Sequence, residues 1–144
     1  MKKILVLNGP NLNLLHKRDS AIYGKTSLEK IAGDCEQLAK QCGIIIDFQQ
    51  SNSEVDLIEA IQRAVDDFDG IVINAAAYTH TSIAIRDALE IFQKPKIEIH
   101  ISNIFKREEF RHHSFLSDVV DGVICGFGPS SYTLALLAIS TMVK

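Results

Sequence analysis

Short runs of apolar residues alternate along this chain with longer stretches in which apolar positions recur every three or four residues. The short runs are typical of buried strands, and the longer stretches are typical of helices with one apolar face. The pattern predicts strands at residues 3–7, 44–49, 71–74, 96–101 and 122–126. It predicts helices at residues 27–42, 54–67, 81–92 and 129–143.

This alternation determines the expected fold class. Strands that alternate with helices favour right-handed crossovers and a parallel sheet that is covered by helices on both faces. We therefore expect an α/β fold, namely a three-layer sandwich around a flavodoxin-like five-stranded parallel sheet. The chain has 144 residues and contains no repeat or linker-like segment, so we expect a single catalytic domain over residues 1–144.

Two of the predicted helices begin beside residues that commonly cap helices. Thr26 or Ser27 opens the first helix, and Ser53 precedes the second. A side-chain oxygen at this place accepts a hydrogen bond from a free backbone N–H of the first helical turn. We expect residues 8–25 to form a long polar loop, and a second polar segment spans residues 102–118.

The strand at 96–101 differs from the others because polar residues alternate with its apolar ones. One face carries Ile97, Ile99 and Ile101, and the other carries Glu98, His100 and Ser102. Glu98 and His100 are close enough on one face to form a hydrogen bond. A carboxylate beside an imidazole fixes its tautomer and favours its protonated form, which prepares a general acid. The alternative interpretation is a polar pair that only stabilises the end of the strand.

Other polar residues follow the predicted strands at their carboxyl ends, where ligands bind in folds of this class. Those that should meet at this edge are Asn8, Asn11, Arg18, Tyr23, Asn74, His80, His100, Ser102, Asn103, Arg107 and Arg111. Such a set suits proton transfer, since an arginine near Tyr23 would favour its phenolate form and make it a base. The lysines lie mainly at the chain start or in helical and loop positions, so we expect none inside a buried strand, where burial would prepare it for imine chemistry.

Composition and charge exclude several classes of function. Hydrophobic residues make up 47% of the chain, charged residues 23%, and the net charge is −3. The negative charge argues against a nucleic-acid partner. No apolar segment suggests a signal peptide or a membrane span, so we expect a cytoplasmic protein with no membrane partner. Cys35, Cys42 and Cys125 lack metal-binding spacing and are interpreted as reduced core residues, and we predict no metal site.

Several motifs together resemble the type II 3-dehydroquinate dehydratases, and the match runs from the first strand to the last helix. No single motif is specific, but the combination is. The matching segments are Leu7–Leu15, Arg18, Tyr23–Gly24, Gln50–Asn52, Ala77–Ser82, Arg86–Asp87, Glu98–Asn103 and Arg107–Ser114.

The resemblance implies a reaction, a set of catalytic residues and an assembly. The reaction is the loss of water from 3-dehydroquinate by anti elimination through an enolate, which gives 3-dehydroshikimate and belongs to the shikimate pathway of aromatic amino acid biosynthesis. The implied catalytic residues are Tyr23 as the base, Arg18 as the lid arginine that favours its phenolate, Asn11 as the enolate stabiliser through a water, His100 as the acid and Glu98 as its orienting partner. The family uses no cofactor and forms a homo-dodecamer that is built from trimers.

The resemblance also implies residues that bind the substrate. They are Asn74, His80, Asp87, Ile101, Ser102, Arg107 and Arg111. The backbone N–H groups of Ile101 and Ser102 would bind the substrate carboxylate, and Arg107 would supply a second positive charge near the site. Asp87 would reach the site of a neighbouring subunit.

The chain departs from the family pattern at a few places near the implied site. The family commonly has a glycine within two residues of Asn74, whereas this chain has Ala75–Ala77. If the glycine allows close approach of the backbone, Ala76 is expected to tighten the pocket. His16 and Ser20 stand in the lid at positions usually occupied by glycine and proline, and Phe105 replaces a frequent histidine.

Two other functional hypotheses compete with the enzyme. A flavodoxin-like binding or signalling module would need flavin contacts or acidic residues after the first strand, where this chain has Asn8 and Asn11. A structural oligomer without activity would not need Arg18, Tyr23 and His100. Within the enzyme hypothesis, the same reaction in quinate breakdown is an alternative to the biosynthetic role.

Overall fold

A computed structural model describes all residues, 1–144, and contains one five-stranded sheet. The strands are β1 (Lys3–Asn8), β2 (Ile45–Gln50), β3 (Gly70–Asn74), β4 (Lys96–His100) and β5 (Gly122–Cys125). Their order is β2-β1-β3-β4-β5, and every neighbouring pair is parallel. This is the flavodoxin-like order, so the predicted fold class is confirmed.

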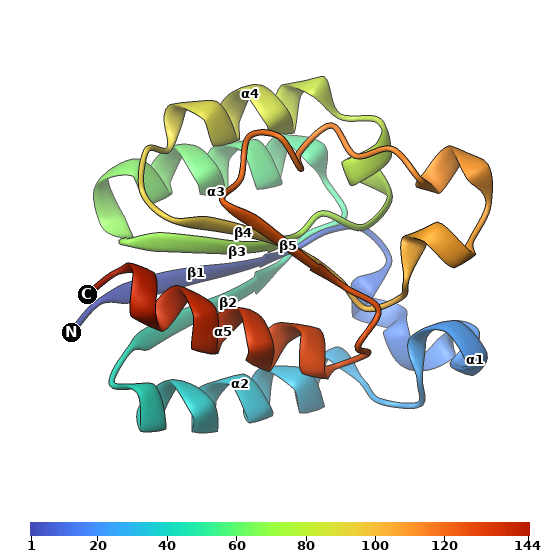
Figure 1. The fold of residues 1–144 in the computed structure, drawn as a ribbon, viewed down its shortest axis with the longest axis horizontal. Coiled ribbons are helices and arrows are strands. Elements are labelled where there is room, and N and C mark those ends of the chain that lie inside the picture. Colours follow the sequence, from blue (N-terminus) through green and yellow to red (C-terminus); the bar gives the residue numbers. More distant parts are fainter.

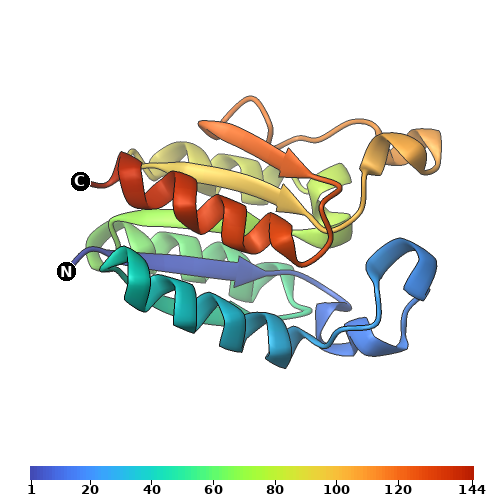
Figure 2. The same cartoon turned by 60° about the horizontal axis from the view of Figure 1, so that its bottom comes forward.

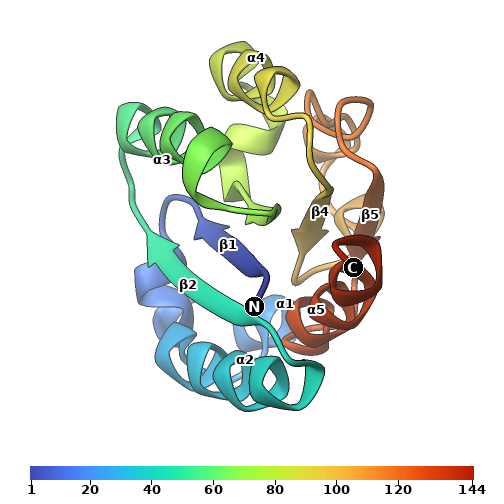
Figure 3. The same cartoon turned by 90° about the vertical axis from the view of Figure 1, so that its left-hand side faces the viewer.

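Two helices cover each face of the sheet, which gives three layers (Figures 1 and 3). The helices α2 (Leu28–Cys42) and α5 (Ser130–Met142) lie on one face, and α3 (Glu54–Asp67) and α4 (Ile83–Ile91) lie on the other. Each face has its own apolar core of buried residues. The isoleucines of β4 belong to the core beneath α2 and α5, as their alternation predicts.

Serine side chains determine where three of the helices begin. Ser27 caps α2 and its side-chain oxygen accepts from the N–H of Lys30, which decides between the two predicted capping residues. Ser53 caps α3 as predicted. Ser82 caps α4, so this helix begins two residues later than the apolar spacing predicts. In each case the side chain satisfies a backbone donor that the helix cannot.

The expectation that residues 8–25 form a loop was wrong in detail, since both this segment and the polar segment 102–118 contain short helices. The first segment contains the 3₁₀ helix η1 (Leu12–Lys17) and the one-turn helix α1 (Ser20–Tyr23), and the second contains η3 (Ile104–Lys106) and η4 (Glu109–Arg111). These elements are too short to show a helical period. A further 3₁₀ helix, η2 (Ala76–His80), follows β3.

The segments that follow β1 and β4 project from the carboxyl edge of the sheet, beyond the arrowheads of the strands (Figure 2). Both chain termini lie at the opposite edge (Figure 2). Polar residues that are distant in sequence are therefore gathered at one edge, as predicted. None of the helices combines the length and the apolar character that are needed to cross a membrane.

Candidate active site

A small cavity, partly open to solvent, lies at the carboxyl edge of the sheet. Nine of the predicted site residues line it: Arg18, Tyr23, Asn74, His80, His100, Ile101, Ser102, Arg107 and Arg111. They come from α1 and the turn before it, the end of β3, η2, and the end of β4 with the segment that follows. Leu12, Ala76, Ala77 and Ile104 complete the wall.

Tyr23 lies between two guanidinium groups. It ends α1 and is only 7% exposed, so it is not the loop residue that the sequence suggested. The guanidinium of Arg18 is 3.9 Å from the centre of its ring, and one nitrogen donates to the phenol oxygen at 2.5 Å. Arg107 is 5.1 Å from the same ring centre. The phenol group of Tyr23 thus lies between two positively charged side chains.

Several hydrogen-bond donors in the cavity have no acceptor in the protein. The Nε atom of Arg107 is buried without a partner, and the only hydrogen bond of this guanidinium, from Nη1 to the Ser102 hydroxyl, is long at 3.4 Å. The backbone N–H groups of Ile101 and Ser102 also donate to no other backbone group. The lining contains three arginines and no carboxylate. Because buried donors are costly when they are unpaired, this cavity is suited to an anionic ligand.

The pair predicted from the strand pattern is formed. Nε2 of His100 is 2.5 Å from a carboxylate oxygen of Glu98, and both side chains are buried. Since an ionised carboxylate only accepts, Nε2 carries a proton, and Nδ1 is the nitrogen that can act on a ligand. Glu98 itself does not line the cavity, and it lies behind His100.

Two serines that sequence reasoning did not assign to the site, Ser114 and Ser117, hold the carboxylate of Glu98. The hydroxyl of Ser114 donates at 3.0 Å and that of Ser117 at 2.6 Å. Burial opposes the charged form, but the hydrogen bond and charge of His100 and the two hydroxyls outweigh it, so the pKa of Glu98 is below its usual value. Glu98 is therefore a carboxylate at neutral pH.

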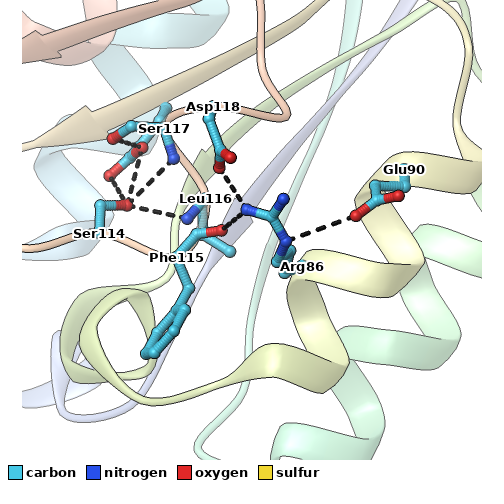
Figure 4. A network of polar contacts seen from close by, with 8 residues as sticks. Arg86, Glu90, Ser114, Phe115, Leu116, Ser117 and Asp118 are labelled. Atoms are coloured by element: carbon cyan, nitrogen blue, oxygen red, sulfur yellow. Dashed lines mark hydrogen bonds and ion pairs between the residues drawn. The ribbon is translucent and has the colours of Figure 1, made fainter.

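The segment that carries these serines is anchored to α4 (Figure 4). The guanidinium of Arg86 donates to the carbonyl of Phe115 at 2.9 Å and pairs with Asp118. Its Nε atom is 3.4 Å from Glu90. Arg86 thus fixes the backbone on both sides of Ser117, which keeps the two hydroxyls directed at Glu98.

His80 presents a neutral imidazole to the cavity. Its Nδ1 lies 2.8 Å from the carbonyl of His113, and because a carbonyl only accepts, this nitrogen carries the proton. Burial lowers the pKa of His80, and the nearby His100 and Arg111 lower it further. The free Nε2 of His80 is therefore a hydrogen-bond acceptor. Its ring is stacked on that of His100 with centroids 6.3 Å apart.

Ala76 has an unusual backbone conformation in the cavity wall. Its φ of 53° lies in the left-handed region, where residues with a Cβ atom are strained and glycine is not. Its N–H donates to the side-chain oxygen of Asn74 at 3.2 Å, which helps to hold the conformation. Ala76 lies within the two residues after Asn74 where the resembled family commonly has a glycine, and here the alanine adds backbone strain as well as a methyl group.

Replacing Ala76 with glycine is expected to raise the free energy of unfolding by up to about 1 kcal/mol, because it removes the left-handed strain at the cost of some unfolded-state entropy. The neighbouring Ala77 does not have a positive φ, so Ala77→Gly is a matched control. The free energy of unfolding of that control is expected to fall by about 0.5–1 kcal/mol. Urea denaturation of the two variants measures the difference. Equal losses would show that the conformation of Ala76 costs nothing.

Besides Glu98, two predicted site residues do not line the cavity. Asn11 is exposed at the start of η1, has a φ of 69°, and its N–H donates to the side chain of Asn52. Asp87 is exposed on α4 and forms no hydrogen bond. Three residues that depart from the family pattern, His16, Ser20 and Phe105, are also exposed and do not line the cavity.

The sheet order and the cavity define the class of protein. An α/β sandwich of flavodoxin-like order carries, at its carboxyl edge, a tyrosine held by arginines opposite a histidine that is backed by a carboxylate. These are the parts of an acid–base enzyme that acts on an anionic small molecule.

Comparisons with known proteins identify the family. The model of the class II dehydroquinases matches residues 2–140. A 3-dehydroquinate dehydratase of Idiomarina loihiensis is 58% identical over 140 residues, which cover 96% of this chain and 92% of the relative. That of Legionella pneumophila is 55% identical over the whole of both chains. A crystal structure of the type II dehydroquinase of Propionibacterium acnes superposes with a TM-score of 0.95 at 45% identity, covering 98% of this chain and 97% of that one. The chain belongs to the class II dehydroquinase family.

Family membership selects the enzyme from the hypotheses that the sequence left open. The resemblance drawn from the motifs is confirmed, and the flavodoxin-like binding or signalling module is set aside. The roles of individual residues are a separate question, because a shared fold and family name do not test them.

Proposed function

We propose that this chain dehydrates 3-dehydroquinate to 3-dehydroshikimate, as a step of the shikimate pathway, by anti elimination through an enolate. The family and the names of its relatives support the reaction. The observation that carries the mechanism is the pairing of Tyr23 with Arg18 at 2.5 Å in the same cavity as His100. A ligand bound in this cavity would therefore have access to both a base and an acid.

In this proposal Tyr23 is the base. Its phenolate removes the proton from the carbon next to the ketone, and the electron pair passes to the ketone oxygen as an enolate. Arg18 and Arg107 stabilise the phenolate beforehand, since both guanidinium groups face its ring. The resemblance implies Asn11 as the residue that stabilises the enolate oxygen through a water, and a water would be needed because Asn11 does not line the cavity.

His100 is the acid in the second step. When the enolate collapses, the bond to the hydroxyl group on the neighbouring carbon breaks, and Nδ1 of His100 supplies the proton that makes this group water. The buried carboxylate of Glu98 holds the ring in place and stabilises its protonated form. Each correctly placed acid or base typically contributes about 10²–10⁴-fold to the rate.

The remaining cavity residues would bind the substrate. The free N–H groups of Ile101 and Ser102 suit the substrate carboxylate, with Arg107 and Arg111 as nearby positive charges. Asn74 and the neutral His80 offer both donors and acceptors for the ring hydroxyls. No residue in this assignment requires a cofactor.

A direct assay tests the proposed function. The product contains a carbon–carbon double bond conjugated with its ketone, so turnover of 3-dehydroquinate appears as rising ultraviolet absorbance. Quinate is the matched control, because it has a hydroxyl in place of the ketone and therefore no acidic proton on the neighbouring carbon. Product from 3-dehydroquinate alone is the expected result. A purified, folded protein that gives no product would contradict the proposal.

We place the enzyme in the cytoplasm and in a homo-oligomer, a dodecamer built from trimers. All three cysteines are free, which suits a reducing compartment. The cavity has three arginines and no carboxylate, although the hydroxyl-rich ring of the substrate needs acceptors. Asp87 is exposed and unpaired in its own chain, so it is available to supply a carboxylate to the cavity of a neighbouring subunit.

Complementation between two inactive variants would reveal a shared site. Asp87→Ala and Tyr23→Phe are each expected to be nearly inactive alone. After mixing and reassembly, about a quarter of the sites would combine an intact Tyr23 with an intact Asp87 from a neighbour, and activity should return in proportion. Each variant reassembled alone is the control. If mass spectrometry shows exchange of subunits and no activity returns, Asp87 does not act across an interface.

A further inference from the structure

A line of four hydrogen bonds runs through the interior from the cavity wall to the backbone of β2. The N–H of Ala76 donates to the side-chain oxygen of Asn74, and the Asn74 amide donates to the Tyr132 hydroxyl at 3.0 Å. This hydroxyl donates to the side-chain oxygen of Asn8 at 2.6 Å, and the Asn8 amide donates to the carbonyl of Gln49 at 3.0 Å. Tyr132, at the centre, comes from α5, on the other side of the sheet from η2 and α4.

The direction of every bond in this line is fixed from its far end. The carbonyl of Gln49 can only accept, so the Asn8 amide nitrogen faces it and the Asn8 oxygen faces Tyr132. The single hydroxyl proton of Tyr132 is used there, and the tyrosine can therefore only accept from Asn74. As a result the amide nitrogen of Asn74 faces inward, and its oxygen faces the N–H of Ala76.

Water cannot take the place of this hydroxyl. Tyr132 and Asn8 are 0% exposed, and Asn74 is 3% exposed. Burial raises the pKa of the Tyr132 phenol, so the group stays protonated and remains a donor. Its ring lies in the apolar core, 6.0 Å from that of Phe48, and a phenylalanine would fill the same space. The hydroxyl is thus not needed to fill the core, and an unpaired hydroxyl there would be costly.

The line ends at the cavity, where Asn74 and Ala76 both form part of the wall. We propose that Tyr132 is a positioning residue for the dehydratase, which fixes the orientation of the Asn74 amide and thereby the donor and acceptor that Asn74 presents to the substrate. The inference rests on the proposed function, in which Asn74 binds a ring hydroxyl. Tyr132 itself does not touch the substrate.

The substitution Tyr132→Phe removes the hydroxyl and keeps the ring. Without it the Asn74 amide loses its inner partner and is held only by the N–H of Ala76, so its orientation is less fixed and binding weakens in the ground state and the transition state alike. We expect KM for 3-dehydroquinate to rise about tenfold with a smaller change in kcat. The same substitution in an Asn74→Ala background is expected to change KM less than twofold, because the residue through which Tyr132 acts is absent.

A matched control separates positioning from a loss of stability. Ile139 lies on the same helix, is 0% exposed, and has no polar contact. Ile139→Val also removes buried atoms from this core and should lower the thermal midpoint while leaving KM unchanged. If Tyr132→Phe does not fold, Asn8→Ala can be used instead, because it removes the acceptor of the Tyr132 hydroxyl. This variant is expected to show the same rise in KM, and the rise should again disappear in the Asn74→Ala background.

The results that overturn the inference are distinct from failure of the proposed function. Equal rises in KM in both backgrounds would mean that Tyr132 does not act through Asn74. An unchanged KM for Tyr132→Phe, or for Asn74→Ala alone, would also overturn the inference. The proposed function would still stand in that case, provided that the unaltered enzyme turns over 3-dehydroquinate normally. Absence of turnover by the unaltered enzyme would overturn both.

Discussion

Tyr23→Phe is expected to reduce kcat by about 10²–10⁴-fold, the contribution of a correctly placed base, while a ring-shaped substrate analogue still binds. The phenyl ring would keep its place because Tyr23 is 7% exposed and packs in the core beneath α2 and α5. The lost atom is the phenol oxygen that accepts from Arg18 at 2.5 Å. Turnover by ultraviolet absorbance and analogue binding by calorimetry separate the two effects.

The control for this prediction removes a tyrosine hydroxyl elsewhere. The hydroxyl of Tyr78 donates to the carbonyl of Asn52, and Tyr78 does not line the cavity. Tyr78→Phe should therefore leave kcat within about twofold, as is usual for substitutions outside an active site. If Tyr23→Phe turned over substrate as fast as this control, the base would have to be another group.

The strands and long helices were predictable because each contains enough residues to show its own period. Five strands were placed within a residue or two of their observed bounds, and the helix at 54–67 matched. The prediction of a loop at 8–25 was wrong because α1 has only four residues, too few to show a helical period. A local signal was nevertheless present: the Asp19 side chain accepts from the N–H of Ala21, as a capping residue does.

The candidate site was predictable where its residues share a strand or follow neighbouring strands. Alternation alone brought Glu98 and His100 together, and nine predicted residues meet in one cavity. Their chemical roles remain predictions. Partners from distant parts of the chain were not assigned: Ser117 is 19 residues from Glu98, and Tyr132 is 124 residues from Asn8. No pattern within a strand or helix encodes such pairs, because only the packing of α5 and of the segment before β5 brings them together.

These distant partners explain why the buried carboxylate of Glu98 is stable in its charged form. Glu98 is 0% exposed, and a lone carboxylate there would become protonated. Four hydrogen-bond contacts from His100, Ser114 and Ser117 reach its two oxygens. The pair that the sequence revealed therefore depends on hydroxyl groups that the sequence did not reveal.

Glu98→Gln should show how much the charge of this carboxylate contributes to turnover. The glutamine keeps the shape but no longer stabilises a protonated His100, and we expect kcat to fall about 100-fold, with a smaller change in KM. Glu36→Gln is the matched control, since Glu36 is exposed on α2, far along the chain from the site. Unchanged kcat in Glu98→Gln would mean that the pair only stabilises the end of β4.

The same variant tests how the charge of Glu98 affects the stability of the fold in acid. Because the pKa of Glu98 is lowered on folding, the unfolded chain binds its proton more readily than the folded chain does. The resulting stabilisation is fully present above about pH 4.3, the ordinary value for glutamate, and is lost as the pH falls through the lower folded value. Glutamine has no such proton to bind. Urea denaturation compares the stability of the unaltered protein with that of Glu98→Gln. The advantage of the unaltered protein should be larger at pH 7 than at pH 3. An advantage that grew in acid would show that Glu98 is protonated in the folded state.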